Sequence, residues 1–424
     1  MNCEEHTFID LFAGAGGLSE GFIRAGFTPI AHIEMKKDAC NTLKTRSAFH
    51  YLKENGKLSV YEKYLRTKKE GTDGSVLWSQ VPSEVTDAAI CATIGENTIG
   101  EIFSRVDRLK RDKSVDLIIG GPPCQAYSVA GRARMGKAVE DDPRNDLYKY
   151  YVQFLERYSP KMFVFENVLG IITAKRGEPF ADLKKMVNDL GYDMDSKVQI
   201  ASQHGVLQNR QRVIIVGWKK SHSDKFGYPN IPIEDMPYQV MRDLFADLPE
   251  RKAGEGSLCE TISYTKPLSE MVYLDKSNIR GVFDFTTQHV ARPTNDNDRQ
   301  IYKIAVDMWR NGKRRLNYAE LPSNLQKHKN KKTFLNRFSV VDPDGCCHTV
   351  VAHIAMDGHY YIYPTLNPTL DNVRSITVRE AARLQSFPDD YYFEGSRTSA
   401  LMQIGNAVPV LLAQKIAESI KKKL

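Results

Sequence analysis

One cysteine of the sequence stands on a loop that suits a nucleophile. Cys124 follows an apolar run, two glycines and two prolines in the segment DLIIGGPPCQAYS, residues 116–128. The apolar run predicts a strand, and open α/β sheets keep their active sites beyond the carboxyl ends of their strands. Structural cysteines usually lie inside apolar elements, whereas a cysteine on a stiff Gly-Pro loop suits nucleophilic attack or ligand binding. No second cysteine or histidine stands nearby to share a metal.

A carboxylate and two arginines lie at later strand ends. Glu166 follows the apolar run MFVF, residues 162–165, and leads into Asn167. It therefore emerges at the same sheet edge, where a carboxylic acid can donate a proton to a bound ring. Without Cys124, a helix-capping or ion-paired glutamate would be the better interpretation. Arg210 and Arg212 alternate as the chain enters a strand, so at most one of them readily contacts a given ligand.

A glycine-rich turn follows the first predicted strand. In DLFAGAGG, residues 10–17, the glycines allow a tight turn and bring backbone amides close to a ligand. Glu20 occupies the place of the third glycine in the dinucleotide-binding pattern, which lowers the rank of a nicotinamide enzyme. Glu34 ends the next predicted strand, where it can accept hydrogen bonds from a ribose diol. The alternative is a surface carboxylate before a helix at Lys36.

These residues need a framework of alternating strands and helices. The apolar runs predict strands at residues 7–11, 28–33, 115–119, 162–166, 197–201 and 212–216. Amphipathic patterns predict helices at residues 18–25, 146–158 and 180–190. The alternation predicts an α/β fold with a doubly wound, mainly parallel sheet.

The alternating pattern of predicted strands and helices changes three times along the chain. Residues 44–97 are polar and look like an insertion into the first domain, which spans residues 1–220. Residues 221–372 are irregular, with short β-like runs at 349–354 and 359–363, and predict a second, smaller domain. Residues 373–424 return to a helical pattern: Thr377 caps a helix, and Pro409 opens the last one. We expect this tail to pack back on the first domain.

Composition excludes several classes of protein. With 424 residues, 42% of them hydrophobic, the chain has enough apolar material for two domains. Seven cysteines with no Cys-x-x-Cys pair indicate neither a disulfide framework nor a zinc cluster. We expect a cytoplasmic protein, since no apolar stretch is long enough for a membrane and the polar start is unlike a signal peptide. The net charge of +7 alone favours a solvated surface.

Taken together, these motifs closely resemble the DNA (cytosine-5-)-methyltransferase family of the bacterial restriction–modification type. The family's ordered motifs correspond here to residues 10–17, 121–128, 166–168, 208–212, 379–388 and 403–409. The resemblance covers residues 7–217 and 375–417. It implies the S-adenosylmethionine-dependent methyltransferase fold, with residues 221–372 as the target-recognition domain.

The resemblance also implies a reaction. Cys124 attacks carbon 6 of a flipped cytosine in double-stranded DNA while Glu166 protonates nitrogen 3, and carbon 5 then takes the methyl group. Arg212 contacts the base carbonyl, while Arg210 and Asn167 steady the cysteine loop. Residues 125–134 correspond to the family's mobile loop, although an ordinary polar surface loop is the alternative. The loop residues expected to contact DNA are Gln125, Ser128, Arg132 and Arg134.

The cofactor implied is S-adenosyl-L-methionine. The expected binding residues are Phe12, Ala13, Gly14, Gly16, Gly17, Glu34, Met35, Glu101, Ile102, Gly121, Leu147, Asn406 and Ala407. Two of these depart from the family's pattern. Met35 stands where a bulky, often aromatic residue is usual, and its polarizable sulfur can still cover an adenine. Glu101 replaces the aspartate that reaches the adenine amine, displaced by the long insertion.

Specificity must lie in residues 221–372, which carry no transferable motif. The basic, aromatic-containing stretch 310–337 and the segment 349–363 with His353 and His359 are candidates for groove contacts, or equally for scaffold. The partners implied are DNA and a separately acting restriction endonuclease, and the family habit is monomeric. A tRNA cytosine methyltransferase is the nearest alternative. A silent DNA-binding regulator would lack Cys124 or Glu166, and both are present.

Overall fold

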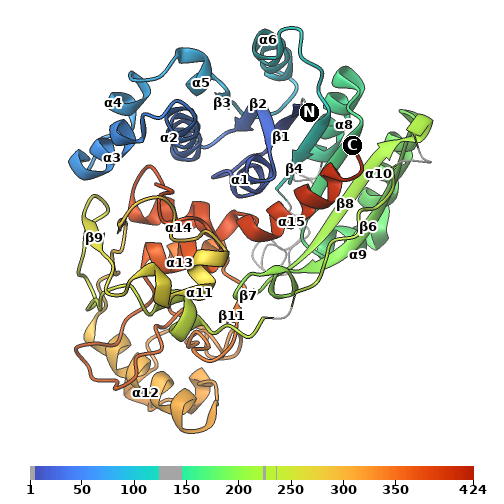
Figure 1. Cartoon of the computed structure of the whole chain (residues 1–424). Helices are drawn as coiled ribbons and strands as arrows, with labels where there is room; N and C mark the ends of the chain where they lie inside the picture. The colour runs from blue at the N-terminus through green and yellow to red at the C-terminus, as the bar shows by residue number, and fades with distance from the viewer. Residues whose placement is uncertain (1–4, 124–145, 223–225, 235) are drawn as a thin grey trace.

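A seven-stranded sheet forms the centre of the computed structural model, which describes residues 5–123, 146–222, 226–234 and 236–424 (Figure 1). The strand order is β3-β2-β1-β4-β5-β8-β6. The strands of this sheet are β1 His6–Leu11, β2 Phe27–Glu34, β3 Ala89–Cys91, β4 Leu117–Gly120, β5 Met162–Asn167, β6 Tyr192–Ile200 and β8 Gln211–Lys219. Only β8 runs antiparallel to its neighbours, β5 and β6. The expected doubly wound, mainly parallel sheet is confirmed.

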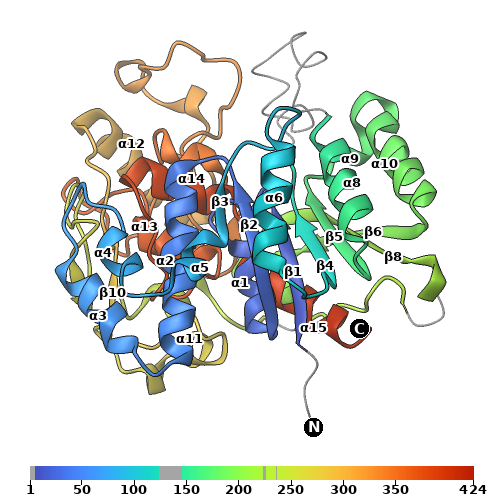
Figure 2. The ribbon, with the colours of Figure 1, turned by 90° about the horizontal axis from the view of Figure 1, so that it is seen from above.

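Helices cover both faces of the sheet (Figures 1 and 2). Those of the first half of the chain are α1 Gly17–Arg24, α2 Lys37–Glu54, α3 Leu58–Thr67, α4 Ser75–Trp78, α5 Ser83–Asp87, α6 Ile99–Lys110, α8 Leu147–Tyr158, α9 Gly170–Thr173 and α10 Glu178–Asp189. Those of the second half are α11 Val272–Lys276, α12 Asp296–Gly312, α13 Val378–Leu384, α14 Arg397–Asn406 and α15 Val410–Lys421. No helix in these ranges is both long and apolar enough to cross a lipid bilayer.

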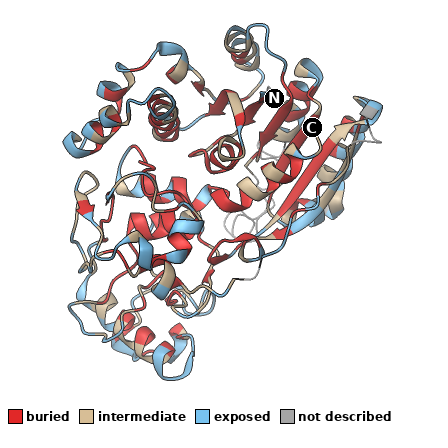
Figure 3. Cartoon of the chain, in the orientation of Figure 1, coloured by how far each residue is buried: buried red, intermediate tan, exposed pale blue. Residues whose placement is uncertain are grey.

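Side chains alternate between the two faces because successive residues of a strand point in opposite directions. Phe8 of β1 belongs to the apolar cluster that contains α1 and α15. Its neighbour Ile9 belongs to the cluster that contains residues of α6, α8 and α10. Figure 3 shows the sheet buried between these layers. The carboxyl ends of β1, β2, β4 and β5 are thereby fixed along one edge.

The last of the helices, α15, packs against the first part of the chain. Thr377 caps α13 in a reciprocal capping box with Glu380, which the sequence predicted only in part. Helix α15 packs on α1 so closely that a Cβ atom on Gly21 would lie 2.4 Å from the Cβ of Ala413. Only glycine allows this approach of the two helices. The chain's end is therefore part of the layer that covers β1 and β4.

The insertion predicted at residues 44–97 is narrower than expected. Its first part belongs to α2, and near its end β3 forms the edge strand of the main sheet. Between them, α3 and α4 join an aromatic cluster in which Tyr61 and Tyr64 meet Phe285 and Tyr392. The prediction was wrong at both ends because β3 has only three residues and the packing partners of α3 are distant in sequence.

The described residues between 221 and 372 form a largely irregular region below the sheet in Figure 1. Its short strands are β9 Thr261–Ser263 and β10 Phe285–Thr287, which pair with each other, and β11 Cys347–His348, which pairs with β7 Gln208–Asn209. The predicted β-like runs at 349–354 and 359–363 were wrong, because the first forms a 3-10 turn at Ala352–Ala355 and in the second Ile362 makes only isolated bridges. Apolar residues of α12 fill a separate cluster with Tyr318 and Phe338.

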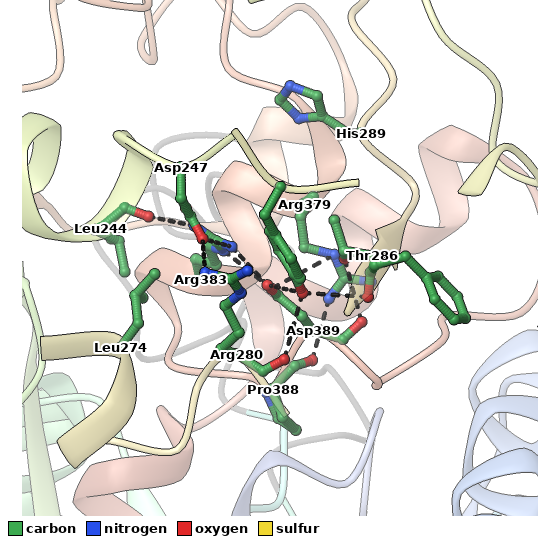
Figure 4. A network of polar contacts seen from close by, with 12 residues as sticks. Leu244, Asp247, Leu274, Arg280, Thr286, His289, Arg379, Arg383, Pro388 and Asp389 are labelled. Atoms are coloured by element: carbon green, nitrogen blue, oxygen red, sulfur yellow. Dashed lines mark hydrogen bonds and ion pairs between the residues drawn. The ribbon is translucent and has the colours of Figure 1, made fainter. Parts of the chain in front are cut away.

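A buried network of charges joins this region to α13 (Figure 4). The guanidinium of Arg383 donates to the carboxylates of Asp247 and Asp389, each at 2.6 Å, and to the backbone oxygen of Leu244 at 2.5 Å. Arg280 also pairs with Asp247 at 3.3 Å. All these charges except that of Arg280 are almost fully buried. Because buried charges are costly unless paired, the network specifies how residues 244–280 sit against α13.

Candidate active site

Glu166 is the penultimate residue of β5 and is partly buried. One of its carboxylate oxygens, Oε1, lies 2.8 Å from Nε of Arg212, and both side chains are largely buried. The other oxygen, Oε2, would lie 2.6 Å from a Cβ atom on Gly121. A larger residue at position 121 would therefore displace the carboxylate. Glu166, Arg212 and Gly121 come from three strand ends and meet at one point.

Asn167 fastens the segment that leads to the predicted nucleophile. Its buried side-chain amide donates to the backbone oxygen of Pro122 at 3.2 Å, and its Oδ1 accepts from the N–H of Val168 at 2.9 Å. Pro122 stands two residues before Cys124 in the chain. The expected DNA contacts Gln125, Ser128, Arg132 and Arg134 lie, with Cys124, outside the described residues.

The two predicted arginines have different surroundings, as their alternation suggested. Arg212 pairs with Glu166, whereas Arg210 is 1% exposed. Among the described residues, Arg210 donates to the backbone oxygen of Val350 at 2.6 Å and to that of Gly405 at 3.5 Å. It therefore links the start of β8 to α14 and to the irregular region.

The glycine-rich turn and Glu34 lie against each other. The backbone N–H of Gly14 donates to Oε2 of Glu34 at 2.9 Å, and that of Lys36 donates to Oε1 at 2.7 Å. Burial raises the pKa of Glu34, and these backbone N–H groups partly offset that rise. Phe12 has a left-handed backbone with φ 58°, a strained conformation that is common at functional turns. Open space lies where a Cβ on Gly14 would stand, so a ligand can approach the backbone there.

The chain's end closes on the same turn. A Cβ atom on Gly17 would lie 2.3 Å from the backbone oxygen of Val408 and 3.1 Å from the Cβ of Ala407. Gly16 has φ 80°, and a Cβ there would lie 2.8 Å from the hydroxyl of Tyr391. Ala13 is held from the other side by a bond from its N–H to the backbone oxygen of Ile33 at 3.0 Å.

Other predicted cofactor residues are less well placed. Met35 is 51% exposed beside Glu34, Asn406 is exposed at the end of α14, and Leu147 is partly buried at the start of α8. Glu101 is exposed on the first turn of α6, while the side chain of Ile102 is in the apolar core. The sequence analysis thus selected two adjacent residues of α6, of which Glu101 faces solvent and Ile102 faces the sheet.

The segment that follows β3 lies beside Glu34, a neighbour that the sequence analysis did not name. Cys91, the last residue of β3, lies opposite Glu34, and the N–H of Ala92 donates to the backbone oxygen of Glu34 at 2.9 Å. Thr93 and Ile94 therefore extend from the sheet edge beside Glu34. The only local signal was the three-residue run AIC, which is too short to separate from the surrounding polar sequence.

The sequence matches the C-5 cytosine-specific DNA methylase family over residues 6–64 and 87–422. The unmatched residues 65–86 contain α4 and the start of α5. The chain is 39% identical to a type II methyltransferase of Bacillus paralicheniformis, covering 97% of this chain and 98% of that protein. It is 30% identical to a type II methyltransferase of Haemophilus parahaemolyticus, covering 99% and 88%.

Solved structures share the fold. A candidate DNA modification methyltransferase encoded within a prophage of E. coli superposes with a TM-score of 0.59 at 24% identity, over 98% of each chain. A DNMT2 of Spodoptera frugiperda gives a TM-score of 0.51 at 14% identity, over 99% of each chain.

Proposed function

Because the chain belongs to the C-5 cytosine-specific DNA methylase family and is therefore a DNA (cytosine-5-)-methyltransferase, we propose that Cys124, Glu166 and Arg212 perform its chemistry. The observation that supports this assignment best is the meeting of Glu166 with Gly121 and Arg212. The bond from Asn167 to Pro122 holds the chain just before Cys124 beside them. A base bound at this edge of the sheet would have an acid and a guanidinium on one side.

Our proposed reaction forms a transient bond between enzyme and base. The Cys124 thiolate attacks carbon 6 of cytosine while Glu166 gives a proton to nitrogen 3, which makes carbon 5 nucleophilic. S-adenosyl-L-methionine, when bound, supplies an activated methyl group. After carbon 5 takes this methyl group, it gives up its proton to a Brønsted base. Nitrogen 3 then returns its proton to Glu166 as the bond from carbon 6 to sulfur breaks and the thiolate leaves. Arg212 holds Glu166 and donates to the oxygen of the base.

The target carbon is stacked inside duplex DNA, so the cytosine must leave the helix to react. Unstacking costs on the order of a few kcal/mol. We assign the loop residues Gln125, Ser128, Arg132 and Arg134 to contacts with the displaced base and nearby phosphates.

The residues around Glu34 suit the cofactor. The Glu34 carboxylate accepts two backbone N–H bonds and keeps further acceptor positions for a ribose diol. Phe12 and Met35 offer apolar and sulfur surface for an adenine. Asn406 and Ala407 would lie toward the methionine end, because Ala407 packs on the glycine turn. For the adenine edge we propose Thr93, which is exposed beside Glu34, in place of Glu101 on α6.

The wider setting follows from the relatives. Both relatives named above are type II methyltransferases. We propose that this enzyme likewise modifies a specific duplex sequence within a restriction–modification system. A cognate endonuclease that acts separately, monomeric action and a cytoplasmic location complete the proposal.

The test is transfer of labelled methyl from S-adenosylmethionine to duplex DNA and, in parallel, to tRNA. We expect label in DNA only, and bisulfite sequencing should place it at one short recurring sequence. Cys124→Ser should abolish transfer while DNA binding persists. The matched control Cys259→Ser replaces a partly buried cysteine that contacts Tyr392 and should remain active. Label confined to tRNA, or full activity in Cys124→Ser, would refute the proposal.

A further inference from the structure

Residues 326–337 form a basic loop that the reaction above does not use. No acidic residue occurs between Glu320 and Asp342. Within this interval Lys327, Lys329, Lys331 and Lys332 are all exposed, and none pairs with an acid in the described part of the chain. The loop therefore presents a concentrated positive field to solvent.

Phe334 stands on this loop with its ring in solvent. It is 64% exposed and is the one aromatic residue among the exposed large apolar side chains of the described residues. Exposed aromatic rings next to lysines are the pattern by which proteins hold nucleic acid, since bases stack on the rings and phosphates meet the charges.

The tip of the loop is held in place. Phe334 has a left-handed backbone with φ 53°. The guanidinium of Arg337 donates to the backbone oxygens of Asn330, Thr333 and Phe334 at 2.7, 2.8 and 2.9 Å. The same guanidinium lies 4.3 Å from the ring centre of Tyr318, which is fully buried. The backbone that carries Phe334 is thus ordered before DNA binds, which lowers the ordering cost of binding.

The position of the loop fits contact with the substrate. In Figure 2 the orange segment that follows α12 projects from the body on the side where β1 and β4 have their carboxyl ends. At its base, Arg315 and Val340 line a cavity of about 460 Å³ together with Asn209, the residue before Arg210. The loop therefore rises from the irregular region beside the strand that leads to Arg212.

We propose that residues 326–337 are a preformed DNA-binding loop. Its lysines bind backbone phosphates, and the ring of Phe334 stacks on the bases that are exposed when the cytosine leaves the helix. This inference rests on the proposed function. A base that leaves the stack deprives its neighbours of a partner, and an aromatic ring replaces part of that contact. The lysines give affinity without sequence preference, and Phe334 acts only on the opened duplex.

The lysines are tested by the salt dependence of duplex binding, for which no recognition sequence is needed. The variant replaces Lys329, Lys331 and Lys332 together by Ala. Its slope of log affinity against log salt should be shallower than that of the wild type by about 2 to 3, at about 0.9 per lost phosphate contact. The matched control removes Lys57, Lys63 and Lys69, which are exposed on the insertion, and should keep the wild-type slope. Equal slopes in wild type and the loop variant would overturn the role of the lysines.

Phe334 is tested with two duplexes that carry the mapped site, one with the target cytosine for turnover and one with 2-aminopurine at the target position to report base displacement. Phe334→Ala should lower both the fluorescence gain and kcat/KM on the order of tenfold, and Phe334→Trp should restore them. The control Val76→Ala changes an apolar residue that is 73% exposed on α4 and should behave as wild type.

The two proposals can fail separately. If the wild-type enzyme methylates DNA and Phe334→Ala matches it in both readouts, the stacking role is refuted while the proposed function stands. If the wild-type enzyme does not methylate DNA, the proposed function fails first. Thermal unfolding of each variant should match the wild type, because the side chain of Phe334 is 64% exposed.

Discussion

Replacing Arg383 by Met should destabilise the protein by about 3 kcal/mol. Arg383 is fully buried and donates to Asp247, Asp389 and the backbone oxygen of Leu244. Met fills a similar volume but leaves two buried carboxylates without their main partner. Removing one member of a buried ion pair costs roughly 3–5 kcal/mol, since the remaining charge stays desolvated.

The lower end of that range follows from the partners that remain. Asp389 keeps a hydrogen bond from the hydroxyl of Tyr264 at 2.8 Å and a weak pairing with Arg379 at 3.9 Å. Asp247 keeps Arg280 at 3.3 Å. Each carboxylate would therefore stay partly neutralised, which limits the loss.

The measurement is urea unfolding of both proteins, followed by circular dichroism. Arg314→Met is the matched control, because Arg314 pairs with Glu320 at 3.2 Å on the surface, with both side chains about half exposed or more. Its loss should be under about 0.5 kcal/mol. A loss below about 1 kcal/mol in Arg383→Met would refute the view that this network holds the two regions together.

The same variant should change the response to acid. Burial alone would raise the pKa of Asp389, but the Arg383 guanidinium outweighs it and lowers that pKa. A carboxyl with a lowered pKa contributes stability that is present above its unfolded pKa and is lost as pH falls through its folded pKa. Below about pH 4, wild-type stability should therefore fall more steeply than that of Arg383→Met.

Three further predictions concern single side chains. Glu166→Gln should slow methyl transfer by roughly 10²–10⁴ while the Kd for S-adenosylmethionine, measured by dialysis, stays within about threefold; turnover within tenfold of wild type would contradict its role. Glu34→Ala should weaken cofactor binding at least about tenfold in calorimetry, because a charged acceptor is lost, and an unchanged Kd would argue against the ribose contact. Burial lowers the pKa of His289 to about 4 in the folded protein. As pH falls, His289 is therefore protonated in the unfolded chain before it is protonated in the folded protein, so stability should fall as pH drops from about 6.5 toward 4. His289→Gln should flatten urea-derived stability across this window, and an unaltered slope would exclude His289 as the cause.

Local sequence patterns were sufficient to predict those strands and caps that depend only on residues close by in the chain. The apolar runs before Asp10 and Glu166 predicted β1 and β5, and Thr377 with a helical pattern after it predicted the cap of α13. Glu34 and the glycine turn could be paired because parallel strands place their carboxyl ends together. Their hydrogen bond is the geometric result of that topology.

Contacts between distant segments could not be predicted in the same way. His359, expected as a candidate for DNA contact, hydrogen-bonds through Nδ1 to Tyr302 at 2.9 Å and packs at 4.6 Å on the ring of Phe338, so it belongs to the scaffold. His353, its companion in that prediction, is exposed and pairs only with Asp357 at 3.4 Å among the described residues. Nothing in the local sequence separates these two histidines, because the difference comes from α12, more than 40 residues away.

The packing of α15 on α1 also fixes when the enzyme becomes complete during synthesis. Roughly 390 residues separate the two helices, and a ribosome working at roughly 5–20 residues per second needs roughly 20–80 s to make them. Throughout that interval Leu18 and Phe22 of α1 lack the apolar partners that α15 supplies. The nascent chain therefore carries an uncovered apolar face that chaperones can bind, and a chain that ends before Val410 can neither bury this face nor close the glycine turn.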